Sequence, residues 1–302
     1  MFNSIRKNKD KTYLIAGLVF LFVAIVFYFV LWYFGFGAIA IPFAVLISII
    51  MSFSSYYFSD KLVLAATHAK PADDEADKKV KNAMEGIVIA AGVPMPRVYI
   101  IEDSSLNAFA TGRNPQNAIV CVTRGLVEKL DYYQLEGVLA HELAHIKNYD
   151  ILLATVVTIM VGAVVIIAHM FQRMAFFGGG GRRRSTNEGG GGQAQLVFLV
   201  IGLILMILAP IFGQLLKMAL SRNREYLADA TAIEFTRNPE GLATALEAIS
   251  GDSAVECADP ATASLFIASP TANAKSKTHG GWFSTHPPIE KRIEALRNIS
   301  SK

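Results

Sequence analysis

The chain contains, at residues 140–148, the stretch Ala140-His141-Glu142-Leu143-Ala144-His145-Ile146-Lys147-Asn148, which carries the pattern His-Glu-x-x-His. On a helix, His141 and His145 project from the same face, so both imidazoles can reach one metal ion. Glu142 follows the first histidine directly, where its carboxylate can hold and deprotonate a metal-bound water. The apolar neighbours indicate a buried helix, in which paired histidines need a partner. The pattern therefore predicts a hydrolytic zinc site of the metalloprotease kind, and not a surface helix with two solvated histidines.

The composition is that of a membrane protein. Of 302 residues, 53% are hydrophobic and 18% charged, and the mean hydropathy is +0.39. Soluble domains average about 45–50% apolar and about 25% charged residues, so we expect an integral membrane protein with one soluble core. The net charge of +3 does not indicate nucleic-acid binding. Cys121 and Cys257 have no metal or redox spacing and are expected to be small buried residues in a reducing compartment.

The first two apolar runs predict a transmembrane hairpin, residues 1–60. Tyr13 to Phe34 follows a basic N-terminal cluster, and Ala38 to Phe53 follows a glycine-containing turn without Lys or Arg. The alternative for the first run is a signal peptide, but the run exceeds the usual core of about 7–15 residues and a second run follows at once. Because the positive flank stays in the cytoplasm, residues from about Ser59 onward are expected there.

Two further apolar runs predict a second hairpin, residues 151–212. They are Ile151 to Ala168 and Leu196 to Phe212, separated by the Gly- and Arg-rich segment 172–195, which we expect to be disordered. The arginines of this segment would lie outside the cell, against the positive-inside rule. Two possibilities remain: the hairpin crosses despite this charge, or it dips into the membrane without spanning it.

Residues 61–150 and 213–302 are expected to form the two parts of one mainly helical, zincin-like α+β domain with a small β-sheet. The charged segment His68 to Lys81 is expected to be a linker that enters a helix ending near Ala91. Asp131, with Gln134 three residues on, predicts a capping box at the start of the helix that carries the metal motif. Alternating and turn-rich patterns predict three strands, at Arg97–Ile101, Asn107–Gly112 and Ala118–Val122.

A catalytic zinc needs three protein ligands and one open position. Ile151 stands where a metzincin would place its third histidine, so Glu225 is the better candidate. Glu225 and Asp229 share a helical face, so one can bind the metal while the other accepts a hydrogen bond from a ligand imidazole. The alternatives are an exposed helix with ordinary Arg–Glu pairs, or His286 as the third ligand. Two apolar runs lie between the metal motif and Glu225. An even number of membrane crossings returns Glu225 to the side of the membrane that holds the metal motif.

Four motifs occur together in one order. They are Asn107-Ala108-Phe109-Ala110, His141-Glu142-Leu143-Ala144-His145, Arg224-Glu225-Tyr226-Leu227-Ala228-Asp229 and His286-Pro287-Pro288. Over nearly the whole chain this combination resembles the HtpX-type heat-shock membrane proteases, relatives of the CaaX prenyl endopeptidases and the mitochondrial Oma-type proteases. The resemblance implies one Zn²⁺ per chain on His141, His145 and Glu225, with Glu142 as general base.

The resemblance also implies a function and a location. It implies a gluzincin-type zinc metalloendopeptidase in the bacterial inner membrane, multi-pass, with its active site facing the cytoplasm. The expected role is quality control of misfolded or damaged membrane proteins under heat or envelope stress. The expected partners are membrane-protein or peptide substrates and the lipid bilayer, without nucleic acid and with an open oligomeric state. In the prenyl-protease relatives, residues that match Asn107, His286 and Arg292 contact the substrate backbone or the developing oxyanion.

Several alternatives stay open. Asn107–Ala110 would be an edge strand to which an extended peptide adds itself, or an edge shielded by the chain's own loop. His286 could donate a hydrogen bond to the tetrahedral oxyanion, or could be a structural histidine that packs the last helix. A processing protease with one narrow substrate shares the same chemistry. A non-catalytic membrane scaffold is a third class, against which the intact Glu142 argues.

Overall fold

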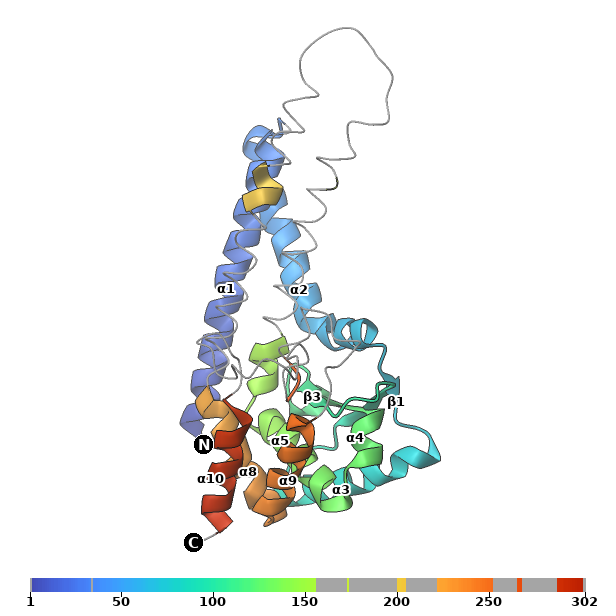
Figure 1. Ribbon diagram of the computed structural model, residues 1–302. Helices are drawn as coiled ribbons and strands as arrows, with labels where there is room; N and C mark the ends of the chain where they lie inside the picture. Colours follow the sequence, from blue (N-terminus) through green and yellow to red (C-terminus); the bar gives the residue numbers. More distant parts are fainter. Residues whose placement is uncertain are drawn as a thin grey trace.

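In the computed structural model, the described residues are 2–33, 35–155, 173, 200–204, 222–251, 265–267 and 287–300. Two long helices project side by side from a body of shorter helices and a small sheet (Figure 1). In chain order the elements are α1 (Phe2–Tyr33), η1 (Gly37–Ile39), α2 (Ala40–Thr67), β1 (Lys70–Pro71), η2 (Glu75–Asp77), α3 (Lys78–Ala91), β2 (Arg97–Ile101), β3 (Ala108–Thr111), η3 (Pro115–Asn117), β4 (Ile119–Thr123), α4 (Arg124–Lys129), α5 (Tyr132–Lys147), α8 (Arg222–Thr236), α9 (Pro239–Ser250) and α10 (Ile289–Ser300).

The projecting pair α1 and α2 contains two segments long and apolar enough to cross a membrane. They are Thr12–Trp32, with mean hydropathy 3.0, and Gly37–Ser54, with mean hydropathy 2.2. Only 12% and 17% of these windows are buried, whereas a core helix of a soluble protein is mostly buried. The first two predicted runs are therefore confirmed as candidate membrane helices. Most of the other two runs and nearly all of segment 172–195 lie outside the described residues, so four spans stay a prediction.

The second helix, α2, joins this hairpin to the rest of the chain. Near its start, Ala40, Ala44 and Ser48 form a buried face of small side chains at intervals of four residues. Small residues on such a face let a neighbouring helix backbone approach closely. The helix continues past the candidate span to Thr67, and its Val63 packs in one apolar cluster with Phe109 of β3.

The sheet has four strands in the order β1-β2-β4-β3, with β2 parallel to β4 and the outer pairs antiparallel. The three predicted strands are present as β2, β3 and β4. The fourth, β1, was not predicted, because two residues inside a charged segment carry no alternating pattern. It forms because Lys70 pairs with Ile100, and an edge position tolerates Pro71, which has no N–H to donate.

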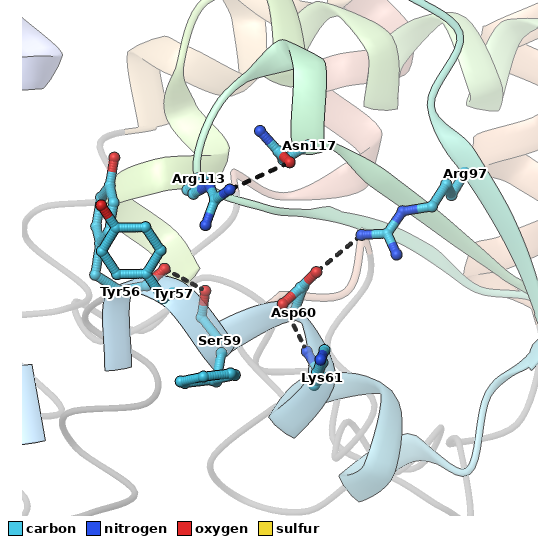
Figure 2. Close-up of a pocket in the computed structure, with 9 residues that line it drawn as sticks. Tyr56, Tyr57, Ser59, Asp60, Lys61, Arg97, Arg113 and Asn117 are labelled. Atoms are coloured by element: carbon cyan, nitrogen blue, oxygen red, sulfur yellow. Dashed lines mark hydrogen bonds and ion pairs between the residues drawn. The ribbon is translucent and has the colours of Figure 1, made fainter. Parts of the chain in front are cut away.

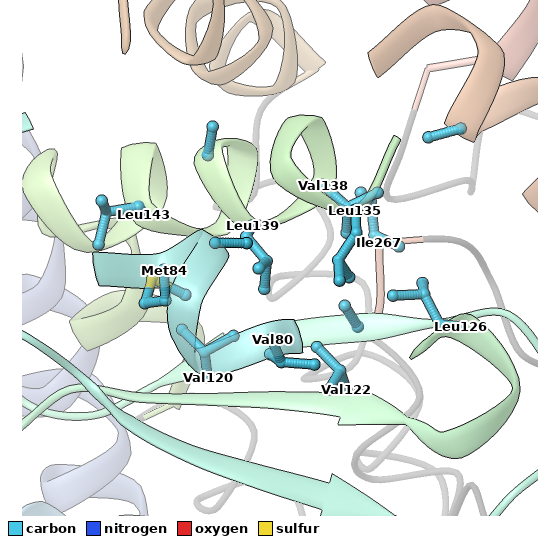
Figure 3. Close-up of a cluster of buried hydrophobic side chains, with 14 of the residues drawn as sticks. Val80, Met84, Val120, Val122, Leu126, Leu135, Val138, Leu139, Leu143 and Ile267 are labelled. Carbon is cyan, nitrogen blue, oxygen red and sulfur yellow. The ribbon is translucent and has the colours of Figure 1, made fainter. Parts of the chain in front are cut away.

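The apolar core lies between the sheet and the helices α3 and α5 (Figure 3). Val80 of α3, Val122 of β4 and Leu139 of α5 are each 0% exposed there. The opposite side of α5 packs against α9 at Gly137, where an added Cβ would lie 2.7 Å from the backbone nitrogen of Leu242. Close packing on both sides therefore fixes the position of the helix that carries the His-Glu-x-x-His motif.

Of the two cysteines, Cys121 lies in β4 and is 0% exposed, as predicted for a small buried residue. Burial, and the nearby charge of Glu142, raise the pKa of its thiol well above the usual range. The thiol is therefore held protonated in the core. Cys257 lies outside the described residues.

Candidate metal centre

The helix α5 begins and ends at defined signals. The predicted capping box is present. The backbone N–H of Gln134 donates to the Asp131 carboxylate at 2.8 Å, and the backbone N–H of Asp131 donates to the side-chain oxygen of Gln134 at 3.0 Å. At the other end, Asn148 caps the helix and Tyr149 adopts a left-handed conformation with φ of 59°. This turn changes the chain direction before residues 150–155, which are helical again.

His141, His145 and Glu225 come together, with their ligand atoms within 4.8 Å of one another. The Nε2 atoms of the two histidines are 3.1 Å apart. The carboxylate oxygens of Glu225, on α8, lie 3.7 Å from each of these nitrogens. Two nitrogens that bind one zinc at about 2.1 Å with tetrahedral geometry are about 3.4 Å apart, so the spacing suits a shared ion.

The other ring nitrogen of His141 is held by Asp229, one helical turn after Glu225 on α8. The distance from Nδ1 to Asp229 Oδ1 is 2.9 Å. Arg292 of α10 donates to both carboxylate oxygens of Asp229, at 2.9 and 2.7 Å, and is 0% exposed. Such a hydrogen bond fixes the tautomer and orientation of a ligand imidazole, so that its Nε2 faces the metal position. Nη2 of Arg292 also lies 3.4 Å from this Nε2.

His145 has an equivalent arrangement, built from different elements. Its Nδ1 lies 3.2 Å from Asp150 Oδ2, and Arg224 of α8 lies 3.3 Å from the other oxygen of Asp150. Asp150 was not predicted as a site residue. On a straight helix, a residue five positions after His145 points about 140° away from it. The left-handed turn at Tyr149 is what allows Asp150 to reach back, and no sequence pattern for that turn was recognised.

The pKa values reflect this network. Burial, together with the positive charge of Arg292, lowers the pKa of His141 to about 4. Burial alone would raise the pKa of Asp229, but Arg292 and the hydrogen bond from His141 outweigh it and lower the pKa to about 2. At neutral pH the site therefore holds a neutral His141, as a metal ligand requires, beside an ionised Asp229.

The pKa of His145 shifts in the opposite direction, which indicates that the site lacks positive charge. Burial opposes the charged imidazolium, but the hydrogen bond to Asp150 and the charges of Glu225, Asp150 and Glu142 outweigh burial and raise the pKa to about 9. Within the described residues, the buried network comprises the carboxylates of Glu142, Asp150, Glu225 and Asp229 and the guanidinium groups of Arg224 and Arg292. With both histidines neutral, as metal ligands are, the four carboxylates exceed the two guanidinium groups by two charges, so the donor set fits a divalent cation such as zinc.

Glu142 is 3% exposed and follows His141 on α5. Its charge acts on both His145 and Arg292, so its carboxylate belongs to the same buried centre. Arg292 also lies 3.6 Å from Glu225.

His286 lies outside the described residues, and its expected role stays a prediction. The described segment resumes at Pro287, which is buried ahead of α10.

The strand β3 is an edge of the sheet and packs beside α5 (Figure 1). Asn107, Ala108 and Phe109 are all buried, and the outward carbonyl of Ala108 accepts a hydrogen bond from the Ile267 N–H at 2.9 Å. Phe266 packs edge-on against Phe109, with ring centroids 4.9 Å apart. At Ala108, therefore, a segment of the chain itself covers the edge.

A buried His-Glu-x-x-His helix, completed by a carboxylate from a second helix and joined to apolar candidate membrane helices, defines a membrane metalloprotease. Residues 74–300 match the model of peptidase family M48, described as "Peptidase family M48". The chain is 42% identical to a "Protease HtpX homolog" of Dictyoglomus turgidum, over 100% of this chain and 95% of that protein. It is 44% identical to a "Protease HtpX homolog" of Listeria monocytogenes, over 99% of this chain and 100% of that protein. The chain belongs to peptidase family M48, among its HtpX-type members.

Solved structures are also similar to this chain. Ste24p of S. mikatae aligns with 98% of this chain at 17% identity and a TM-score of 0.48, and this chain spans 66% of that protein.

Proposed function

We propose that the chain is a zinc endopeptidase that cleaves misfolded or damaged membrane proteins at the cytoplasmic face of a bacterial inner membrane. The observation that carries the proposal is the buried cluster of His141, His145 and Glu225, whose ligand atoms lie within 4.8 Å of one another. The two aspartates that hold the histidine Nδ1 atoms support it, because they aim both Nε2 atoms at one point.

In this proposal His141, His145 and Glu225 hold one zinc ion. A bound zinc ion polarises a carbonyl and lowers the pKa of water to about 7. Glu142 accepts the proton of the attacking water and delivers it to the leaving amine. Arg292 positions Asp229 and Glu225 through its buried ion pairs. The contact of Arg292 with substrate, and the donation from His286 to the oxyanion, remain further proposals.

The substrate is proposed to bind as an extended strand along the outer edge of β3. The backbone N–H and carbonyl of Ala108 point away from β4. Those of Ala110, two residues further along the strand, therefore point away from β4 as well. Ala110→Pro removes this outward N–H while the bonds between β3 and β4 stay in place. We expect a raised KM with unchanged metal content. An unchanged KM would instead favour an edge shielded permanently by residues 265–267.

The orientation is proposed from the charge flanking α1. Single cysteines near Ser185 and Asn187 should react with an impermeant thiol reagent added to intact cells, if the second hairpin spans the membrane. Labelling only after the membrane is opened would leave a re-entrant hairpin. Neither outcome depends on the identity of the metal.

The function itself is tested with the purified full chain in mild detergent. We expect one zinc per chain by elemental analysis, and cleavage of an unfolded membrane protein that chelation abolishes and added zinc restores. Zinc-independent cleavage would contradict the proposal. A substrate trap with an inactive variant then separates quality control, which captures many membrane proteins, from a processing protease, which captures one.

A further inference from the structure

A cavity of about 260 Å³ lies where α2 meets the sheet (Figure 2). One wall is residues 56–61 of α2, and the other is formed by Arg97 at the start of β2 and by Arg113 and Asn117 in the connection between β3 and β4. The membrane hairpin and the protease domain therefore both contribute to this one cavity, which shares no residue with the metal centre.

The cavity begins just beyond the candidate membrane span, which ends at Ser54. With a helical rise of about 1.5 Å per residue, Tyr56 lies about 3 Å and Lys61 about 10 Å along the axis from that point. Lipid headgroups occupy about 5–7 Å on each side of the hydrocarbon core, so Tyr56 lies at headgroup depth and the backbone of Lys61 lies just beyond it, within reach of its long side chain. The aromatic residues Tyr56, Tyr57 and Phe58 fit such a position, because tyrosine is enriched at membrane interfaces.

Positive charge is in excess around the cavity. Among the described residues that line it, Asp60 is the single carboxylate, and it forms an ion pair with Arg97 at 2.8 Å. Within the described part of the chain, neither Lys61 nor Arg113 forms an ion pair with a carboxylate. Both cations line the cavity and remain available to an anionic ligand.

The guanidinium of Arg113 is nevertheless held in position. It lies over the ring of Tyr57, 4.9 Å from the centroid, and donates a hydrogen bond to Asn117 at 3.4 Å. Figure 2 shows Arg113 between these two partners, on the side of the cavity opposite α2. A guanidinium has five N–H donors in a fixed fork that matches the oxygens of a phosphate, and these two contacts leave several of them free.

We propose that this cavity binds the phosphate group of an anionic phospholipid headgroup, with Arg113 and Lys61 as its charged contacts. The aromatic side chains of α2 then border the glycerol and the upper acyl chains. A zwitterionic headgroup is disfavoured, because its cationic part meets the excess positive charge. Since both walls contribute, the bound lipid holds the protease domain against the bilayer surface.

The test uses the full chain in mixed micelles of neutral detergent and phosphatidylglycerol, with bound lipid counted by native mass spectrometry. The double variant Arg113→Gln with Lys61→Gln is expected to bind phosphatidylglycerol about 30-fold more weakly, since each basic residue near an anionic surface contributes about fivefold. The control is Lys78→Gln with Lys81→Gln on α3, which removes the same charge at exposed salt bridges away from the cavity. The control is expected to bind like the wild type.

A second variant protects the test against misfolding. Asp60→Asn removes the single carboxylate among the described residues that line the cavity. This variant is expected to bind phosphatidylglycerol about fivefold more strongly, which a misfolded protein would not do. Equal binding of phosphatidylglycerol by the double variant and its control would overturn the proposal. Weaker phosphatidylglycerol binding by Asp60→Asn would overturn it too. Displacement of the lipid by millimolar inorganic phosphate would also overturn it, because the cavity would then be a site for free anions.

Discussion

The candidate metal centre and the cavity at the end of α2 are both built from charged side chains, but they balance those charges differently. In the metal centre, Asp229 and Arg292 are 3% and 0% exposed and pair directly with each other. At the cavity, the Arg97 side chain is 53% exposed and pairs with Asp60, while two other cations have no carboxylate partner within the described residues. Burial makes an unpaired charge costly, whereas water screens an exposed one.

This difference has a consequence for each region. In the buried centre, the carboxylates outnumber the guanidinium groups, and a divalent cation would balance the excess negative charge. In the exposed cavity, the pairing is weak and the excess charge is available to a ligand from outside.

Removal of the buried guanidinium should have the largest effect on stability. Arg292→Met leaves Asp229 and Glu225 without their partner and is expected to cost about 3–5 kcal/mol. The control Arg97→Met breaks the exposed pair with Asp60 and should cost no more than about 1 kcal/mol. Denaturant unfolding of the metal-free full chain in detergent, followed by near-UV circular dichroism, measures both. Equal costs would remove the distinction between the two regions.

Removal of the proposed third ligand should reduce metal affinity more than removal of either aspartate that holds a ligand histidine. Glu225→Ala is expected to weaken zinc binding more than about 100-fold, because it removes a donor atom as well as a charge. Glu234→Ala, an exposed carboxylate on the same helix, is the matched control and should bind zinc normally. Competition with a chelator gives both affinities. Normal binding by Glu225→Ala would place the third ligand elsewhere, with His286 as the next candidate.

The two aspartates behind the histidines should have smaller and similar effects. Asp229→Asn and Asp150→Asn are each expected to weaken zinc binding about 10–100-fold, because each loses the charged acceptor that orients one imidazole. The same chelator competition measures them. If Asp150→Asn has no effect while Asp229→Asn does, the left-handed turn at Tyr149 has only a structural role.

The dependence of metal affinity on pH should be the mildest effect. A proton on His145, with its pKa of about 9, competes with the metal, while His141, with a pKa of about 4, is already deprotonated at neutral pH. Zinc affinity should therefore rise about tenfold per pH unit between pH 6 and 8, as one proton is displaced. A hundredfold rise per unit would mean that both histidines are protonated in the free site. A flat profile would mean that neither is.

Much of this architecture follows from local sequence signals. The capping box at Asp131 and the four-residue spacing of His141 and His145 define α5 and its metal-binding face. Alternation indicates β2, and the turn-rich segment between β3 and β4 separates those two strands. Glu225 could be chosen as a ligand only because Asp229 shares its face and because the number of apolar runs returns it to the same side of the membrane.

Other features depend on contacts between distant parts of the chain, which no local pattern contains. Asp150 reaches His145 only through the left-handed turn at Tyr149. Ile267 covers Ala108 across a long sequence separation. Arg292 was expected to contact the substrate, but its burial beside Asp229 becomes visible only once α10 packs against α8.

In the proposed mechanism, His141, His145 and Glu225 hold one metal ion, while Glu142 moves the proton without binding the metal. The most direct test compares Glu142→Gln with the wild type, measuring zinc per chain and cleavage of an unfolded membrane protein in the same preparations. We expect unchanged zinc content and cleavage that is slower by about 100–10,000-fold, the usual contribution of a general base. Loss of zinc together with activity would make Glu142 a ligand or a structural residue, and cleavage at the wild-type rate would remove it from the mechanism.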